Sequence, residues 1–381
     1  MEIKIFLELA IILIAAKIFG LFTRKIHLPQ VVGALLAGIV LGPAVLNIVE
    51  KSEMITNLAE IGVLLLMFSG GMETDLKGLR SSWKSSFVIA VFGVVLPLAS
   101  GFALAFLFGQ DLMRSIFIGL ILTATSISIT IEVLHEMGKL KTKVGTAILG
   151  AAVIDDILGV IILSFIIGGG GGIISAGFMV LLLKICGFFA VAIIGGYGVY
   201  KLFEVLSVKF GNTRRLPIFG LGLCFLLAYA AERLGVADIT GAYIAGLVFS
   251  NSRAEKYIEE KNYILSYMFF SPVFFISVGL MTSFDGFTGE TVLFAFLLLI
   301  AAVVSKLFGC GLGALLFKFT GKEAVQIGTG MISRGEVAII VATKGMTAGL
   351  MEPRLFSSII IVVILTTLIA PILIKFAFLE K

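Results

Sequence analysis

Two adjacent carboxylates, Asp155 and Asp156, lie in the middle of a strongly apolar run, GAAVIDDILGV. Neighbouring residues on a helix point about 100° apart, so both side chains can border one cavity while facing different partners. Two carboxylates this close, and partly removed from water, do not both ionise readily, so one of them should bind a proton near neutral pH. Such a carboxylate can hold either a proton or a small cation. The pair therefore indicates exchange of the two by competition.

Lys306 is a third ionisable residue at membrane depth, in the middle of the run AAVVSKLFGCG. It lies too far from the ends of this run to reach the membrane surface. Ionisable residues inside a bilayer are costly and are functional candidates by default. We expect Lys306 to pair with one of the aspartates, which keeps the empty site charge-balanced. Burial of these charges for stability alone is the alternative, which two acids in one apolar helix make the poorer explanation.

Two segments carry residue types that interrupt helices. The first is TATSISIT (123–130), with hydroxyl groups on Thr123, Thr125, Ser126, Ser128 and Thr130. Such side chains compete for backbone hydrogen bonds. The second is TGMISRGE (329–336), with two glycines. We expect Arg334 and Glu336 to neutralise the facing half-helix ends or to pair with each other, with direct ion handling as the alternative. Freed carbonyl and hydroxyl oxygens are hard ligands suited to an alkali cation.

The composition indicates that these ionisable and helix-interrupting residues lie on membrane-spanning helices. Of 381 residues, 59% are hydrophobic and only 14% are charged, and the mean hydropathy is +1.14. A soluble protein of this size could not bury so much apolar surface in one core. The sequence contains no nucleophile–histidine pair and no zinc-type Cys/His spacing, so we expect neither an enzyme nor a bound cofactor. Its partners are then the bilayer and the transported ions, and no nucleic acid is indicated.

A bilayer core needs about 20 apolar residues per helix. We count thirteen candidate spans at 3–22, 30–48, 56–72, 86–108, 113–133, 143–168, 176–206, 215–233, 238–250, 263–281, 291–317, 323–349 and 355–378. The connections alternate in charge, with 18 basic residues on one side and 6 on the other. The positive-inside rule then places the N-terminus outside and the C-terminus in the cytoplasm. The charged stretch 253–261 is predicted to be a solvated loop, as are the surroundings of His27 and His135.

The two halves of the chain are related by an offset of 208 residues. GALLAGIV (33–40) matches GAYIAGLV (241–248), and Ser69, Gly71 and Thr74 match Ser277, Gly279 and Thr282. This predicts one six-helix repeat at about 3–168, a linker helix at about 176–206 and a second repeat at about 215–378. Seven helices, an odd number, precede the second repeat, so it enters the membrane in the opposite orientation to the first. Inverted repeats are typical of secondary transporters, with the site near the midplane. Duplication for packing alone is the alternative.

At these residues the chain resembles the membrane domain of the cation:proton antiporter-2 family, the NapA/KefC-like sodium or potassium:proton antiporters. The resemblance covers essentially all 381 residues. Its most specific features are the combination of TATS, IDD, Lys306 and RGE. It is also carried by LPQVVGALLAGIVLGP (28–43) and LAEIGVLLLMFSGGMETDL (58–76).

The resemblance implies an NhaA/NapA-like antiporter fold with two crossed broken helices. It implies an elevator-like core domain (about 86–168 and 291–378) and a homodimer formed by the remaining helices. Asp156 matches the principal carrier of cation and proton, and Asp155 matches the carboxylate paired with the lysine that Lys306 matches. Thr125 and Ser126 match the site on the unwound helix, and Glu336 matches the acid of the RGE motif.

We therefore predict a homodimeric multi-pass protein of the inner membrane that exports Na⁺ or Li⁺, imports H⁺ and serves pH and sodium homeostasis. Sodium would bind at Asp156 with Asp155 and Thr125 nearby. An aspartate at the first position, where KefC-like potassium systems carry Gln, favours electrogenic sodium exchange. Potassium:proton exchange with the same machinery is the close rival. A sodium-coupled symporter is a more distant one, since few intramembrane polar residues are left over for a solute.

Overall fold

All regular structure in the described part of the chain is helical, as predicted. The structure, a computed structural model, describes residues 4–26, 28–167, 176–210, 215–250, 252–253, 255–282, 289–347, 349–351 and 353–379. Helices are the expected solution for apolar segments in lipid, because every backbone N–H and C=O then finds a partner inside its own segment. His27 lies outside the described residues.

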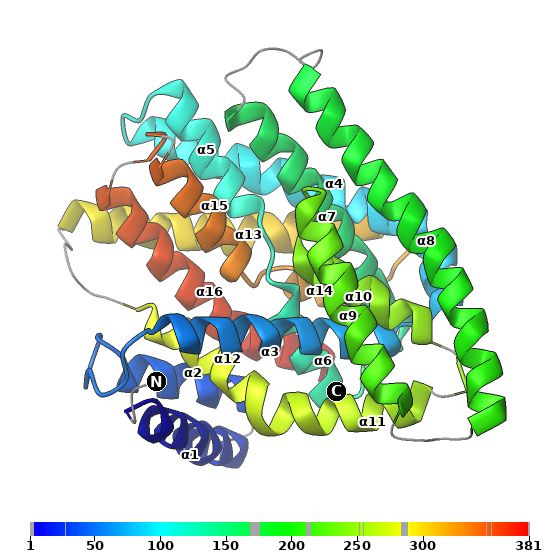
Figure 1. Cartoon of the computed structure of the whole chain (residues 1–381). Helices are drawn as coiled ribbons and strands as arrows, with labels where there is room; N and C mark the ends of the chain where they lie inside the picture. Colours follow the sequence, from blue (N-terminus) through cyan, green and yellow to red (C-terminus); the bar gives the residue numbers. More distant parts are fainter. Residues whose placement is uncertain are drawn as a thin grey trace.

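The helices follow one another along the chain as α1 (Lys4–Lys25), α2 (Gln30–Leu41), α3 (Glu53–Met72), α4 (Leu76–Leu107), α5 (Leu112–Thr123), α6 (Ile127–Glu136), α7 (Lys143–Ile167), α8 (Ala176–Phe210), α9 (Arg215–Arg233), α10 (Asp238–Phe249), α11 (Glu255–Leu265), a π-helical turn (Ser266–Phe270), α12 (Ser271–Leu280), α13 (Gly289–Leu315), α14 (Gly321–Gly330), α15 (Glu336–Thr347) and α16 (Pro353–Phe378). Figure 1 shows α8 along one edge of the molecule and α1 at the opposite lower corner.

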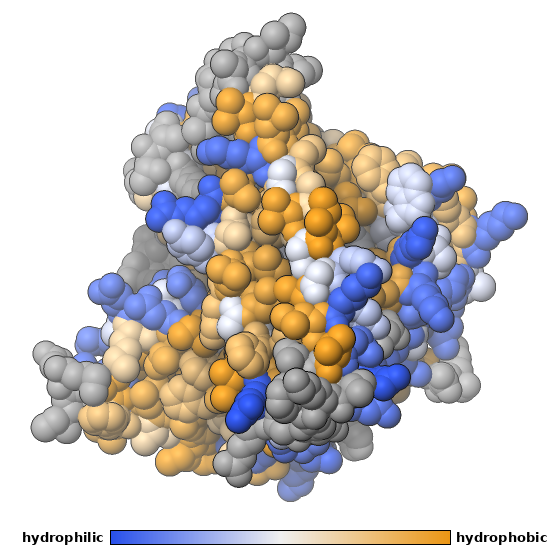
Figure 2. All heavy atoms as spheres, turned by 45° about the vertical axis from the view of Figure 1, so that its right-hand side comes forward, coloured by the Kyte–Doolittle hydropathy of each residue, from blue (hydrophilic) through white to orange (hydrophobic). Residues whose placement is uncertain are grey.

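The chain is a multi-pass membrane protein. Ten helical runs in its described part are long and apolar enough to cross a bilayer, counting α5–α6 as one run and α11–α12 as another. Helices α2 and α10 are shorter apolar helices. Hydrophobic side chains cover much of the face in Figure 2, with hydrophilic ones gathered towards its edges. On α8 the large side chains Leu183, Val191, Ile193 and Ile194 point outward, as lipid-facing residues do.

Both predicted interruptions are present. Helix α5 ends at Thr123, and α6 begins at Ile127 after extended backbone at Ser126. Helix α14 ends at Gly330, and α15 begins at Glu336. The hydroxyl of Thr123 donates to the carbonyl of Leu120, so the side chain binds a carbonyl near the end of its own helix. This is the competition with the backbone that the hydroxyl-rich sequence predicts.

The predicted loop at 253–261 is wrong, because α11 is a helix that continues through the π-helical turn into α12. Ile258 and Asn262 are four residues apart and therefore share its buried face. The Asn262 amide donates to the carbonyl of Leu65 and to the hydroxyl of Ser69. A single polar side chain thus anchors a helix whose outer face is charged. The second span is shorter than predicted, since α2 ends at Leu41, just before Gly42 and Pro43.

Four glycines let two pairs of helices touch backbone to backbone. Helices α2 and α12 cross at Gly38 and Gly279, and α3 and α10 cross at Gly71 and Gly246. A Cβ atom on Gly38 would lie 2.9 Å from the Cα of Gly279, and one on Gly71 would lie 2.9 Å from the Cα of Gly246. Small residues of this kind stabilise helix pairs in lipid, where close packing drives association.

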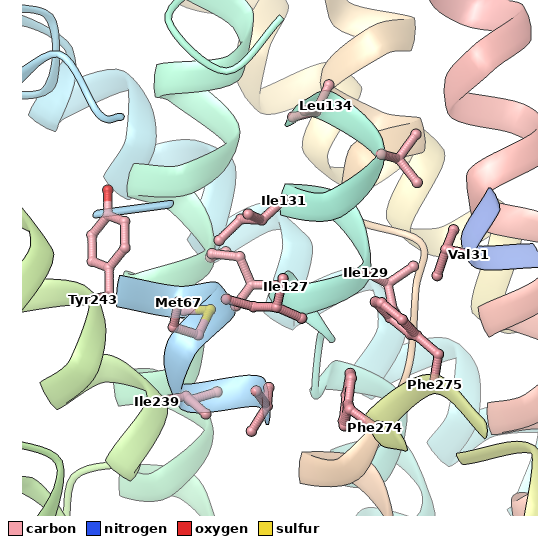
Figure 3. Close-up of a cluster of buried hydrophobic side chains, with 14 of the residues drawn as sticks. Val31, Met67, Ile127, Ile129, Ile131, Leu134, Ile239, Tyr243, Phe274 and Phe275 are labelled. Atoms are coloured by element: carbon pink, nitrogen blue, oxygen red, sulfur yellow. The ribbon is translucent and has the colours of Figure 1, made fainter. Parts of the chain in front are cut away.

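The half-helix α6 is surrounded by these crossed helices. Figure 3 shows Ile127 and Ile131 of α6 facing Met67 of α3, while Ile129 lies beside Phe275 of α12. All of these side chains are buried in one apolar cluster. Apolar packing against α2, α3 and α12, together with a hydrogen bond from the backbone N–H of Gln30 to the carboxylate of Glu136, therefore holds α6 in place.

Replacing Gly38 by alanine is expected to destabilise the protein by about 1–3 kcal/mol, because the new methyl group overlaps the carbonyl oxygen of Ile276 on α12. Thermal unfolding of the purified protein in detergent measures the effect. Gly222→Ala is the matched control, since a Cβ on this glycine of α9 meets nothing within 4 Å. Equal melting temperatures for the two variants would contradict the proposed backbone contact.

Candidate ion-coupling site

Asp155 lies on α7 in a fully enclosed environment. Its Oδ1 and Oδ2 atoms are 2.9 and 3.0 Å from the Nζ atom of Lys306 on α13. The hydroxyl of Thr125 donates to Oδ2 over 2.7 Å. The two charged side chains are 1% and 0% exposed. The carboxylate therefore has two donors and a countercharge, as a charge removed from water requires.

The lysine reaches this position because α4 leaves space for it. A Cβ on Gly93 of α4 would lie 3.5 Å from the Nζ of Lys306 and 2.7 Å from the Sγ of Cys310. Glycine at this point lets the lysine side chain and the neighbouring thiol pack against the α4 backbone. Helices α4 and α13 are in extensive contact, which holds Lys306 over α7.

Asp156 follows Asp155 on α7 but has a different environment. It lines a small cavity together with Ile157, Val160, Ile185 of α8 and residues 235–237, which connect α9 to α10. Asp156 is only partly buried, whereas Asp155 is 3% exposed. The turn of about 100° between neighbouring helical residues thus separates a closed carboxylate from one that faces a cavity.

The two interrupted helices cross beside this pair. The backbone N–H of Ser126 donates to the carbonyl of Ser333 over 2.8 Å. The hydroxyl of Thr130 donates to the carbonyl of Gly330 over 2.7 Å. A Cβ on Gly335 would lie 2.5 Å from the hydroxyl oxygen of Ser126, so only glycine fits at this crossing. Side-chain and cross-segment bonds thus satisfy backbone groups that the interruptions release.

Arg334 lies inside the second interruption and is 1% exposed. Its guanidinium group donates to the carbonyls of Met331 and Ile332, just beyond the end of α14, and to that of Ala302 on α13. A positive charge at this place opposes the negative end of the α14 dipole. Glu336 is the first residue of α15, and its side chain lies outside the part of the structure that is described.

The structure brings some of the predicted site residues together. Thr125, Asp155 and Lys306 form one hydrogen-bonded group. Ser126 lies at the helix crossing, with its hydroxyl 3.1 Å from that of Ser128. Asp156 lines its own cavity, so the predicted sodium ligands divide between a closed pair and a cavity-facing carboxylate.

Sequence reasoning missed a second polar group. His135, predicted to be solvated, instead lies in the last turn of α6 with its Nε2 atom 2.8 Å from the Oε1 atom of Glu73. Glu259 of α11 completes the group. The available signal was topological, since the alternation of spans places the ends of α3 and α6 and the start of α11 on the same side of the membrane.

A buried lysine–carboxylate pair beside two crossed helix interruptions is typical of ion-coupled secondary transporters. The chain belongs to the sodium/hydrogen exchanger family. The family model described as "Sodium/hydrogen exchanger, transmembrane" matches residues 10–380. The family's named members are antiporters, which are transporters rather than enzymes.

Relatives agree with this assignment, and a solved structure shares the fold. The chain is 41% identical to the Na(+)/H(+)-K(+) antiporter GerN of Bacillus cereus over 99% of its own length and 97% of the relative. It is 36% identical to the Na(+)/H(+) antiporter of Enterococcus hirae over 97% and 96% of the two chains. In fold it is similar to the sodium proton antiporter MjNhaP1 of Methanocaldococcus jannaschii, with a TM-score of 0.76 at 18% identity over 98% and 96% of the chains.

Removing one partner of the buried pair is expected to be severe. Lys306→Met should cost about 3–5 kcal/mol of stability, because it leaves the Asp155 carboxylate buried without a countercharge. Adding Asp155→Asn should recover most of this loss, since neither charge of the pair is then buried and Thr125 still has an acceptor. Melting temperatures of the two single variants and the double variant form a double-mutant cycle. Additive losses would contradict a coupled pair.

Proposed function

We propose that the protein exchanges sodium, or lithium, for protons across the cell membrane, with both ions competing for the paired-aspartate site. The observation that carries the proposal is the contrast between the two carboxylates. Asp155 is closed by Lys306 and Thr125, whereas Asp156 faces a cavity. The names of the relatives, which include Na⁺/H⁺ antiporters, support the choice of ions.

In this mechanism Asp156 holds the proton or the cation. The carboxylate must be deprotonated to bind Na⁺, so binding of Na⁺ releases H⁺. The Asp155–Lys306 pair opens when the cation enters, which lets Asp155 and the hydroxyl of Thr125 offer oxygen ligands to a hard cation. Lys306 can then lose its proton. The pair keeps the empty site charge-balanced, and loss of the Lys306 proton removes a positive charge that would repel the cation.

We further propose thirteen crossings arranged as two inverted six-helix repeats around α8. The ten long runs, the short helices α2 and α10 and the interrupted pair α14–α15 together make up this number. The glycine contacts support the symmetry. Gly38 touches Gly279, and Gly71 touches Gly246. The 208-residue offset converts Gly38 into Gly246 and Gly71 into Gly279, so it exchanges the two contacts.

The domain division follows the same symmetry. The core is proposed to comprise 86–168 and 291–378, which contain both interrupted helices, Asp155 and Lys306. The remaining helices form the dimerisation domain of a homodimer, and the core moves against it like an elevator. The apolar packing of α6 against α2, α3 and α12 supports a sliding contact, because dispersion contacts are non-directional and can be exchanged.

The subfamily and the orientation are also proposals. Adjacent aspartates with a pairing lysine favour the NapA-like branch of the cation:proton antiporter-2 family. The bias of basic residues favours an outer N-terminus and a cytoplasmic C-terminus in the cell membrane. Potassium:proton exchange is the second candidate, favoured by the printed name of GerN, which includes K⁺ as well as Na⁺.

Asp156→Asn is expected to abolish Na⁺-driven proton movement in proteoliposomes, because an amide can neither release a proton nor bind Na⁺ by charge. Asp111→Asn is the matched control, since Asp111 is an exposed N-cap of α5 and Asn caps helices equally well. The control should transport at the wild-type rate. Normal exchange by Asp156→Asn would contradict the mechanism, and proton movement driven by K⁺ alone would establish the second candidate.

A further inference from the structure

Three potential metal ligands converge at the ends of three helices, away from the aspartate pair. Glu73 follows α3, His135 lies in the last turn of α6 and Glu259 lies on α11. One ligand atom from each residue lies within 4.8 Å of the others. The closest approach is 2.8 Å, between His135 Nε2 and Glu73 Oε1. Neither the family match nor the proposed exchange mechanism gives these residues a role.

Glu73 points into this cluster in an unusual state. The residue is 8% exposed, and within the described part of the chain its buried Oε1 atom accepts no hydrogen bond. The His135 Nε2 atom lies 2.8 Å from Oε1, a contact that is an ion pair only when the imidazole is protonated. A buried carboxylate oxygen in this state costs free energy. Two ligands of one shared cation would approach each other about as closely as this.

The surroundings orient the imidazole ring and give the nearest cation a partner of its own. The Tyr263 ring lies 4.8 Å from the His135 ring, centroid to centroid, and stacks in turn on Tyr267. The nearby cation Lys141 is 2.9 Å from Glu255, which gives it a carboxylate partner outside the cluster. The His135 side chain is 25% exposed, so an ion can reach it from water.

The donor set selects the class of ion. Two carboxylates and an imidazole suit zinc and similar first-row divalent ions, whereas sodium prefers oxygen ligands alone. Zinc distances of about 2.0–2.2 Å place tetrahedral ligands about 3.3 Å apart. The distances in the cluster range from 2.8 Å to no more than 4.8 Å. Small side-chain rotations therefore bring all three to bonding distance, with water in the fourth position.

We propose that Glu73, His135 and Glu259 bind a divalent transition-metal ion that locks the transporter. His135 belongs to the proposed core through α6, whereas Glu73 and Glu259 belong to the helices outside it. A bound ion joins the two parts and holds them in one arrangement. The locking role rests on the proposed elevator exchange, whereas the binding site stands on the geometry of the cluster. Free metal then acts as an inhibitor of exchange.

Binding is tested on the purified full chain by titration with Co²⁺, followed by its visible absorption, and with Zn²⁺ by calorimetry. One ion per chain is expected. Each of Glu73→Gln, His135→Ala and Glu259→Gln should weaken binding by at least the roughly 10- to 100-fold that loss of an outer-shell partner costs. Glu260→Gln is the control, because this neighbour of Glu259 is exposed and pairs with Lys261. No binding, or binding that the three variants leave unchanged, overturns the site.

Locking is tested by adding Zn²⁺ to wild-type proteoliposomes during Na⁺-driven proton movement. Exchange should fall in the wild type and in Glu260→Gln but persist in His135→Ala. Metal binding without slower exchange overturns the lock. If the titration finds no metal bound to the wild type and the three variants alter the pH profile of exchange, the metal site is overturned and the cluster is purely protonic. Absence of exchange in metal-free wild type would instead count against the proposed function, since the titration is independent of transport.

Discussion

The ion pair between Lys306 and Asp155 is the constraint on which the rest of the structure depends. Two opposite charges with exposures of 0% and 1% persist in an apolar protein only if each neutralises the other and further donors complete their shells. Thr125 supplies such a donor. The pair is costly to bury and costly to break. Three separate elements position it: α7, α13 and the first helix interruption. Asp156 then lies next to a charge that is already compensated.

The other special features follow from bringing these elements together. The helix must stop near Thr125 for its hydroxyl to face α7, and the carbonyls released by the interruptions need new donors. Arg334 and the hydroxyl of Thr130 provide them. Glycines at 93 and 335 leave room for a lysine side chain and for the crossing of two backbones. Together these groups give the charged site many of the polar partners that low dielectric surroundings require.

Sequence reasoning located the features that depend on residues close to one another in the chain. Charges in apolar runs and hydroxyl-rich or glycine-containing interruptions are visible in one dimension, so the positions of Asp155, Lys306 and both interruptions could be predicted. The family resemblance alone predicted which aspartate contacts the lysine. The contact depends on the orientation of the helix about its own axis, which the sequence does not reveal. The helix at 255–265 was missed because its inward face is marked by only Ile258 and Asn262. The contact between His135 and Glu73 joins residues 62 positions apart and depends on the packing of α3 against α6.

Competition at one carboxylate is the central claim, and proton release on sodium binding tests it most directly. The purified protein, held in weakly buffered detergent solution near the middle of its active pH range, is mixed with NaCl while a pH-sensitive dye is followed. Choline chloride at the same ionic strength is the reference. The account predicts that sodium releases protons and that its apparent affinity falls as the pH is lowered. Sodium binding without proton release, with an affinity independent of pH, would contradict the account.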